Sequence, residues 1–183
     1  MLLNKETDFS QMDTLKIGIL SDTHNELSEQ VSSIIKDCDI AIHAGDIGCS
    51  AVLEALQPKL GHVIAVAGNN DKPYLWDVKD WEVVKNLPDV KKLILPRGMV
   101  VIEHGHEHDS YKPSHSDLRN AHPKARLVIY GHTHIQVIDK EDATTHVINP
   151  GAAGFTRNKG GASCIVLTIN NNLWDYKAYK FSD

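Results

Sequence analysis

Five short polar motifs carry most of the side chains in this sequence that could do chemistry. Each motif follows an apolar run, and together they supply carboxylate, amide and imidazole groups without a thiolate. Oxygen donors combined with several imidazoles suit manganese, iron, zinc or nickel, and they disfavour magnesium and calcium. We therefore predict a transition-metal site. Its candidate ligands are Asp22, His24, Asp46, Asn69, His104, His132 and His134.

The number of donors predicts two ions rather than one. Seven candidates exceed the roughly three or four protein ligands of a single zinc site, and they suit two ions that share a bridging carboxylate. One such motif alone is a weak signal, because histidines near turns are common at protein surfaces. Five motifs in order, each at the end of a predicted strand, favour metal binding over side chains that merely face solvent.

The elements that position the first three motifs alternate between strand and helix. The runs 16–20, 39–44 and 62–67 are short and apolar, which predicts buried strands, and apolar residues at helical spacing separate them. In open α/β sheets, ligands bind beyond the carboxyl ends of the strands. The first three motifs lie at these ends, so we expect them to project into one crevice.

The second part of the chain is predicted to be mostly β-structure. Two sheets packed face to face with helices outside would make one α/β domain over residues 15–183, preceded by a loose N-terminal arm over residues 1–14. A hairpin turn is expected at 96–98, a partly helical segment at 110–121 and a tight turn at 170–172. Strands are expected at 81–84, 92–95, 99–103, 126–130, 135–139, 144–148, 162–169 and 173–179.

Two features of spacing would bring the donors together. Side chains at i and i+2 of a strand point the same way, so Asp22 and His24 can reach one ion, as can His132 with His134. The same spacing also fits pairs that face one side of a sheet with nothing bound. Glycines in the motifs let the backbone turn sharply at strand ends and approach the ions closely. These glycines are Gly45, Gly68, Gly105 and Gly131.

From about Lys16 to Tyr179 the sequence resembles the calcineurin-like metallophosphoesterases, in particular the small single-domain bacterial and archaeal phosphodiesterases. The family pattern is present as SDTH, AGD, AGNND, EHGH and YGHTH. The resemblance implies a four-layer α-β-β-α sandwich with two mixed sheets and a metal site at the C-terminal ends of the strands. It also implies a dinuclear phosphoesterase, a phosphodiesterase rather than a monoesterase, in which a metal-bridging hydroxide attacks a small phosphorylated substrate directly.

The resemblance also assigns the ligands and the ions. The first ion would be held by Asp22, His24, Asp46 and His134, and the second by Asp46, Asn69, His104 and His132. Asp46 would bridge two divalent ions, with manganese expected first and iron, zinc or nickel as alternatives. In the fourth motif His104 takes the ligand position ahead of His106, which, like His108, faces either substrate or solvent.

The sequence departs from many relatives at Asn70, where they carry a histidine that protonates the leaving oxygen. An amide cannot act as a general acid. Either His106 or Asp71 takes over part of that role, or the leaving group departs with little help. We assign Asp46, Asn70 and His106 as catalytic candidates, and Asn25, Asn70 and Arg157 as substrate-binding candidates. Arg157 could equally be a solvated surface charge.

The remaining histidines and tryptophans have a structural interpretation. His43 lies inside an apolar run, so we expect a buried residue that supports a ligand rather than a ligand itself. Tryptophan more often fills a core than covers a cleft, which is the expectation for Trp76 and Trp81. Four histidines have no motif around them and are interpreted as surface or packing residues: His62, His115, His122 and His146.

Composition and charge exclude several classes of function. The 183 residues include 24 acidic and 19 basic side chains and a formal charge of −5, which disfavours broad nucleic-acid binding. The 3 cysteines lack C-x-x-C spacing, the N-terminal residues lack a signal-peptide pattern, and no apolar run approaches the ~20 residues of a membrane span. We expect a cytoplasmic protein with no membrane partner, and a homo-oligomer is left open.

Two other functions compete with the phosphodiesterase prediction. A non-catalytic scaffold of the same fold occurs in the retromer subunit, which has lost a metal-site histidine, whereas this chain retains His24. A nuclease of the same superfamily would need a basic surface and extra domains, for which this chain gives no indication.

Overall fold

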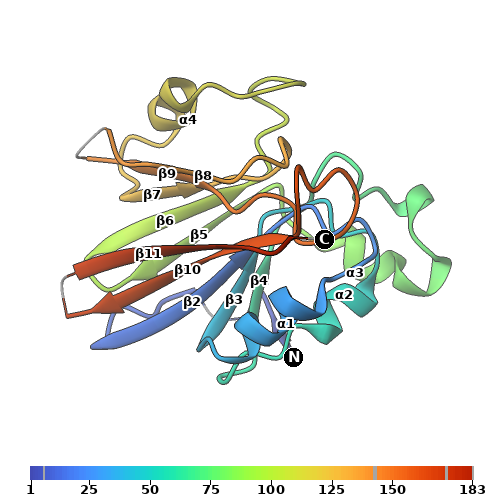
Figure 1. Ribbon diagram of the computed structural model, residues 1–183, viewed down its shortest axis with the longest axis horizontal. Helices are drawn as coiled ribbons and strands as arrows, with labels where there is room; N and C mark the ends of the chain where they lie inside the picture. The colour runs from blue at the N-terminus through green and yellow to red at the C-terminus, as the bar shows by residue number, and fades with distance from the viewer. Residues whose placement is uncertain (6, 142–143, 172, 183) are drawn as a thin grey trace.

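Two mixed β-sheets pack face to face, and helices cover the outer face of each sheet (Figure 1). This is the four-layer α-β-β-α arrangement that the sequence predicts. The computed structural model describes residues 1–5, 7–141, 144–171 and 173–182. None of the helices within these ranges is both long and apolar enough to cross a membrane.

The first sheet has parallel strands at its centre and antiparallel strands at one side. In spatial order, its described strands are β1 (Leu2–Leu3), β4 (His62–Ala65), β3 (Ile40–His43), β2 (Thr14–Leu20), β10 (Ser163–Asn170) and β11 (Leu173–Lys180). Strands β1 to β4 run parallel, so the carboxyl ends of β2, β3 and β4 lie at the same edge. The turn expected between β10 and β11 includes Asn172, which lies outside the described residues.

The second sheet also combines parallel and antiparallel pairs. In spatial order, its described strands are β5 (Val90–Leu95), β6 (Gly98–Glu103), β7 (Leu127–Ile129), β9 (His146–Asn149) and β8 (Val137–Asp139). Strands β6, β7 and β9 run parallel, while β5 and β8 are antiparallel edge strands. The β5–β6 hairpin turns at Pro96 and Arg97, which confirms the turn predicted there.

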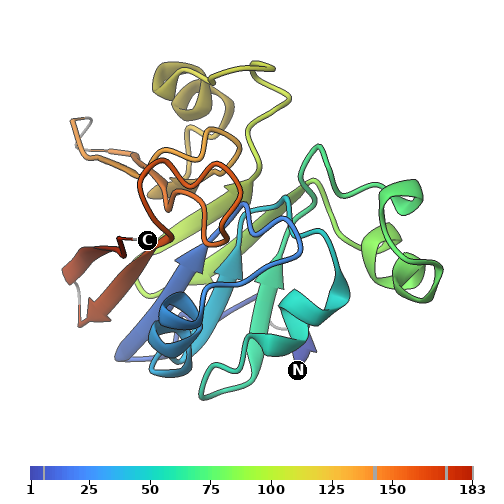
Figure 2. The same cartoon turned by 45° about the vertical axis from the view of Figure 1, so that its right-hand side comes forward.

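Buried apolar side chains hold the four layers together. The central core between the sheets contains Ile19, Ile42 and Ile129, and each such side chain contributes about 1.5–3 kcal/mol by burial. Helices α1 (Glu29–Lys36), α2 (Ser50–Ala55) and α3 (Trp81–Lys85) pack on the first sheet, and α4 (His115–Ala121) packs on the second. Figure 2 shows α1 and α2, in blue and teal, in front of the parallel strands, with the olive α4 across the molecule.

Residues 81–84 form a helix rather than the strand expected from their valines. Two single-turn 3₁₀ helices, η1 (Pro73–Leu75) and η2 (Val78–Asp80), lead into α3. The Asp80 carboxylate accepts a hydrogen bond from Ser50 Oγ at 2.8 Å, which ties this segment to α2, and Val84 is buried in the outer core. Tertiary contacts therefore override the weak local preference of these valines for a strand.

The N-terminal segment is docked, which differs from the loose arm expected over residues 1–14. Strand β1 adds to the first sheet beside β4. The Asn4 side chain donates to Ala65 O at 2.9 Å and accepts from Ala65 N at 3.0 Å, and Phe9 is buried between the sheets. The polar composition of the segment did not predict this docking, because its polar contacts are made by backbone groups and the Asn4 amide.

Candidate metal centre

The five polar motifs lie in loops at the carboxyl ends of β2, β3 and β4 in the first sheet and of β6 and β7 in the second. Backbone hydrogen bonds join these loops directly. Asp22 N donates to Gly45 O at 3.0 Å, and Gly131 N donates to His104 O at 3.2 Å. Between the two sheets, His132 N donates to Asp22 Oδ2 at 3.1 Å, so the loops of both sheets meet and bring the candidate ligands together.

Five of the seven candidate ligands have a left-handed backbone conformation. Their φ angles lie between 47° and 70°, and this conformation costs on the order of 1–3 kcal/mol for a residue other than glycine. Residues 21–25 and 131–134 form loops and turns rather than strands. The alternation of side chains along a strand therefore does not orient these ligands, which differs from the expectation. Backbone strain of this kind clusters at functional sites, where surrounding contacts enforce it. The five residues are Asp22, His24, Asp46, His132 and His134.

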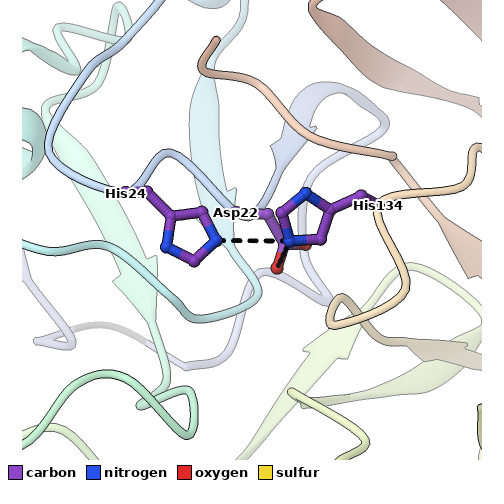
Figure 3. Close-up of side chains that lie close together, drawn as sticks. All are labelled: Asp22, His24 and His134. Atoms are coloured by element: carbon purple, nitrogen blue, oxygen red, sulfur yellow. Dashed lines mark hydrogen bonds and ion pairs between the residues drawn. The ribbon is translucent and has the colours of Figure 1, made fainter. Parts of the chain in front are cut away.

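Asp22, His24 and His134 form one group of potential ligands, and their donor atoms lie within 4.8 Å of one another (Figure 3). His134 Nε2 lies 3.2 Å from His24 Nε2 and 3.4 Å from Asp22 Oδ1. His134 Nδ1 lies 3.0 Å from the Thr156 carbonyl and donates to it, which leaves the Nε2 lone pair facing the other two side chains. The group therefore presents several lone pairs to one small space.

Asp22, Asp46 and His104 form a second such group. His104 is buried, its Nδ1 donates to the Ala44 carbonyl at 2.8 Å, and its Nε2 has no hydrogen-bond partner among the described residues. This nitrogen lies 3.4 Å from Asp46 Oδ2 and 3.9 Å from Asp22 Oδ1. Buried polar atoms are almost always paired, so an unpaired imidazole nitrogen beside two carboxylates fits a metal ligand.

Asn69 and His132 lie beside the second group. His132 Nδ1 is 3.0 Å from Asn69 Oδ1, and His132 Nε2 is 3.0 Å from the Ser110 carbonyl. Donation from Nε2 to that carbonyl leaves Nδ1 as an acceptor that faces the amide oxygen. Asp46 Oδ2 lies 3.7 Å from His24 Nε2 and 3.4 Å from His104 Nε2, which is the intermediate position expected of a bridging carboxylate.

Burial and neighbouring charges shift the pKa values of the centre in both directions. Burial raises the pKa of Asp22 to about 7. Burial opposes the charged form of His104, but the carboxylates of Asp46 and Asp22 outweigh it and raise the pKa of His104 to about 9. Burial and the charge of Arg157 lower the pKa of His134 to about 4. A divalent cation would favour ionised carboxylates and neutral imidazoles throughout this group.

Asp71 is a buried structural residue rather than the free proton donor that the sequence allowed. Its carboxylate accepts hydrogen bonds at 2.8–3.1 Å from the backbone nitrogens of Ile47, Gly48 and Gly68. It also accepts from Trp76 Nε1 at 3.2 Å. These bonds tie the loop of the second motif to that of the third. The only sequence signal for this role was an acidic residue directly after the two asparagines.

Two further buried residues support the ligand loops. Asn149 Nδ2 donates to Gly131 O at 2.6 Å, and Asn149 Oδ1 accepts from Gly151 N at 2.9 Å, so this side chain holds the fifth motif. His43 Nε2 lies 2.9 Å from Thr23 Oγ1, and burial lowers the pKa of His43 to about 3. It is therefore a neutral supporting histidine, as expected.

Gly45 and Gly68 allow the loops to approach the ligands. Gly45 has a φ of +91°, and a Cβ there would lie 2.7 Å from His104 Nδ1. A Cβ at Gly68 would lie 2.1 Å from Asp46 Oδ1. A side chain at either position would displace a candidate ligand, which agrees with the role predicted for these glycines.

The catalytic candidates Asn70 and His106 differ in their contacts. Asn70 N donates to Asp46 Oδ1 at 2.8 Å and its Nδ2 donates to Asp46 Oδ2 at 2.7 Å, so Asn70 orients this carboxylate. The His106 ring lies 5.5 Å from the His104 ring, and His106 Nε2 is 3.2 Å from the Glu107 carboxylate. His104 belongs to a ligand group and His106 lies beside it, which favours His104 as the ligand.

A cavity of about 200 Å³ lies beside the centre and is lined in part by His134. Arg157 Nη2 is 3.5 Å from His134 Nε2, so this arginine faces the cavity as a substrate-binding residue would. Asn25 is exposed and is not part of the lining. The lining carries three cationic side chains, Lys112, Arg157 and Lys159.

Similarity to known proteins agrees with this geometry. The calcineurin-like phosphoesterase superfamily domain matches residues 15–172. A phosphodiesterase from Methanocaldococcus jannaschii is 31% identical over 150 residues, which cover 75% of this chain and 83% of that protein.

Solved structures share the fold at lower identity. Vacuolar protein sorting 29 from Cryptosporidium parvum has a TM-score of 0.72 at 15% identity, covering 94% of this chain and 100% of that one. A phosphoesterase from E. coli has a TM-score of 0.60 at 19% identity, covering 91% and 99%. On the strength of the domain match and the Methanocaldococcus relative, the chain belongs to the calcineurin-like phosphoesterase superfamily.

Proposed function

We propose that the protein is a phosphodiesterase that uses two divalent ions held by the candidate metal centre. The observation that carries this proposal is the buried, unpartnered His104 Nε2 facing the carboxylates of Asp22 and Asp46. Membership of the superfamily and the activity named for the Methanocaldococcus relative support a phosphoester as substrate.

The seven candidate ligands would divide between the two ions, with Asp46 shared. When bound, such a pair supplies an activated water nucleophile and offsets the charge that develops on the phosphoryl oxygens. Asn70 holds both oxygens of Asp46 in the orientation required for sharing. We propose manganese as the first ion, followed by iron, zinc or nickel, because the donors are oxygen and imidazole.

Cationic side chains would bind the phosphate group of the substrate. Arg157 lines the cavity beside His134, and a guanidinium group can make paired hydrogen bonds with phosphate oxygens. Lys112 and Lys159 add positive charge to the same cavity, although the whole chain carries a charge of −5. The volume of about 200 Å³ suits a small phosphorylated molecule.

The fate of the leaving group limits the choice of substrate. Asn70 commits its amide to Asp46, and Asp71 accepts hydrogen bonds from the loop backbone, so neither is free to protonate a leaving oxygen. His106 is the remaining candidate beside the centre. We therefore propose a preference for phosphodiesters with good leaving groups over alkyl monoesters.

The test is hydrolysis by purified protein reconstituted separately with manganese, iron, zinc or nickel. We expect near two ions per chain, and faster turnover of bis-(p-nitrophenyl) phosphate than of glycerol phosphate. Equal turnover of the two substrates would contradict the leaving-group argument. Failure to bind any of the ions, together with no hydrolysis, would contradict the enzyme itself.

A second candidate function is a non-catalytic scaffold on the same fold, which the structural similarity to vacuolar protein sorting 29 favours. In that case no reconstituted form would hydrolyse either substrate, although it could bind ions. For location we propose the cytoplasm, because a reducing compartment suits three unpaired thiols. These are Cys38, Cys49 and Cys164.

A further inference from the structure

A third group of donor atoms lies next to the chain segment that carries His104. Glu103 is the last residue of β6, His108 lies in the loop that follows, and His122 caps the C-terminal end of α4. His108 Nε2 lies 2.9 Å from Glu103 Oε1, and His122 Nε2 lies 3.1 Å from Glu103 Oε2. One donor atom from each residue falls within 4.8 Å of the other two. We call these three residues the Glu103 cluster.

One oxygen of this cluster is buried without a hydrogen bond. The Glu103 side chain is 8% exposed, and within the part of the chain that the structure describes its Oε1 has no hydrogen-bond partner, although His108 Nε2 is close. The ring nitrogen and the oxygen therefore approach each other without the geometry of donation. A buried carboxylate oxygen left unpaired destabilises the folded protein, and a cation between the two atoms would remove that cost.

We propose that Glu103, His108 and His122 bind one zinc ion, in addition to the ions of the candidate centre. Two imidazoles and one carboxylate form a recognised zinc ligand set that leaves a fourth position for water. Bonds of ~2.1 Å in a tetrahedron place ligand atoms ~3.4 Å apart. The two histidine nitrogens lie 2.9 and 3.1 Å from different oxygens of Glu103, and one donor atom of each residue falls within 4.8 Å of the other two, so the side chains would shift to reach this geometry.

The position of the cluster indicates what the ion would do. His108 and His122 are partly exposed, at 21% and 14% of their side-chain surface, so an ion can enter from solvent. The loop between β6 and α4 also carries His106 and Ser110, whose carbonyl lies 3.0 Å from His132 Nε2. Zinc would tie this loop to the end of α4 and so restrain the side of the centre that His132 occupies.

The competing explanation is a purely hydrogen-bonded cluster, in which His122 donates to Glu103 Oε2. The double variant His108→Gln/His122→Gln separates the two, because glutamine can still donate to Glu103 but replaces both imidazoles. Zinc per chain would be measured by elemental analysis after zinc loading and gel filtration, in the wild-type and Asp46→Asn backgrounds. His146→Gln is the matched control, since His146 contacts Tyr176 OH instead.

We expect the double variant to hold one zinc ion fewer than its parent in both backgrounds, and His146→Gln to hold the same number. An unchanged zinc content in the double variant would overturn the proposal. If that variant does not fold, zinc should protect His108 and His122 of the wild-type protein from diethyl pyrocarbonate, as read by peptide mass spectrometry. Equal modification of both histidines with and without zinc would also overturn it.

Discussion

The candidate metal centre and the Glu103 cluster both gather imidazoles around carboxylates, but the chain holds them in different ways. Backbone carbonyls orient His104 and His134 in the centre, and five of its ligand candidates have strained, left-handed backbones. None of the three residues of the Glu103 cluster has a positive φ, and they join a strand end, a loop and a helix end. Backbone strain is therefore concentrated in the candidate metal centre, where two buried carboxylates must be held close together.

The largest expected effect falls on the centre. Asp46→Asn should lower kcat/KM for bis-(p-nitrophenyl) phosphate by about 10³-fold or more, because it removes the shared carboxylate and several kcal/mol of transition-state stabilisation. Steady-state kinetics of the manganese-loaded protein would measure this, with His146→Gln as the control expected to retain activity. If the Asp46→Asn protein keeps more than about a tenth of the wild-type kcat/KM, catalysis cannot be assigned to the candidate metal centre rather than to the Glu103 cluster.

The next effect concerns Asp71, the buried carboxylate that holds the loops of the centre together. Asp71→Asn should lower the free energy of unfolding by about 2–3 kcal/mol, because an amide has one acceptor atom and leaves buried N–H groups unpaired. Urea unfolding of the metal-free protein would measure the change. The exposed Asp77 provides the matched control, and Asp77→Asn should shift the midpoint very little. Equal midpoints for the two variants would show that Asp71 does not hold the loops.

Removal of zinc by a chelator should show that the candidate metal centre binds zinc more tightly than the Glu103 cluster does. Partners that orient metal ligands raise affinity by about 10–100-fold, and His104 and His134 have such carbonyl partners. As chelator concentration rises, zinc-loaded protein should therefore lose one ion from the Glu103 cluster first, and lose the activity only when the centre empties. Residual zinc and activity would be followed in the same samples. Loss of activity with the first ion released would reverse the assigned order.

The last prediction concerns a pH dependence of the metal-free protein. His104 has a pKa of about 9, raised from an ordinary value of 6.5, so the folded state binds this proton more tightly than the unfolded state. Its stabilisation is complete below about pH 6.5 and is lost as the pH rises through about 9. We expect Tm to fall over this window with chelator present and to change less with metal bound. A metal-free Tm that stays constant or rises would contradict this.

Much of the fold and the set of candidate ligands could be predicted because their signals are local. A short apolar run followed at once by a polar motif is visible within a few residues, and the predicted fold and family are both confirmed. The sequence predicted that the ligand side chains converge because they alternate along a strand, but the structure brings them together in another way. Asp22 and His24 lie in the loop after β2 with positive φ rather than on a strand, and local sequence does not encode that choice.

The features that could not be predicted depend on contacts between distant residues. Asp71 gains its structural role from backbone groups of another loop, 24 residues away at Ile47. Glu103 and His122 are 19 residues apart, and the histidine was interpreted as a surface or packing residue because no motif surrounds it. The helix at 81–85 likewise depends on burial of Val84 in the outer core. Such contacts follow from the assembled layers and not from periodicity.

The docking of β1 beside β4 also protects the protein against aggregation. An edge strand with unpaired backbone groups can recruit a strand from another molecule. Here β1 pairs with His62 and Val63, and the Asn4 side chain satisfies both backbone groups of Ala65. Three of the four residues of β4 are thereby covered, and the new edge is only two residues long. The parallel side of the first sheet therefore presents few unpaired backbone groups with which a strand of a second molecule could pair.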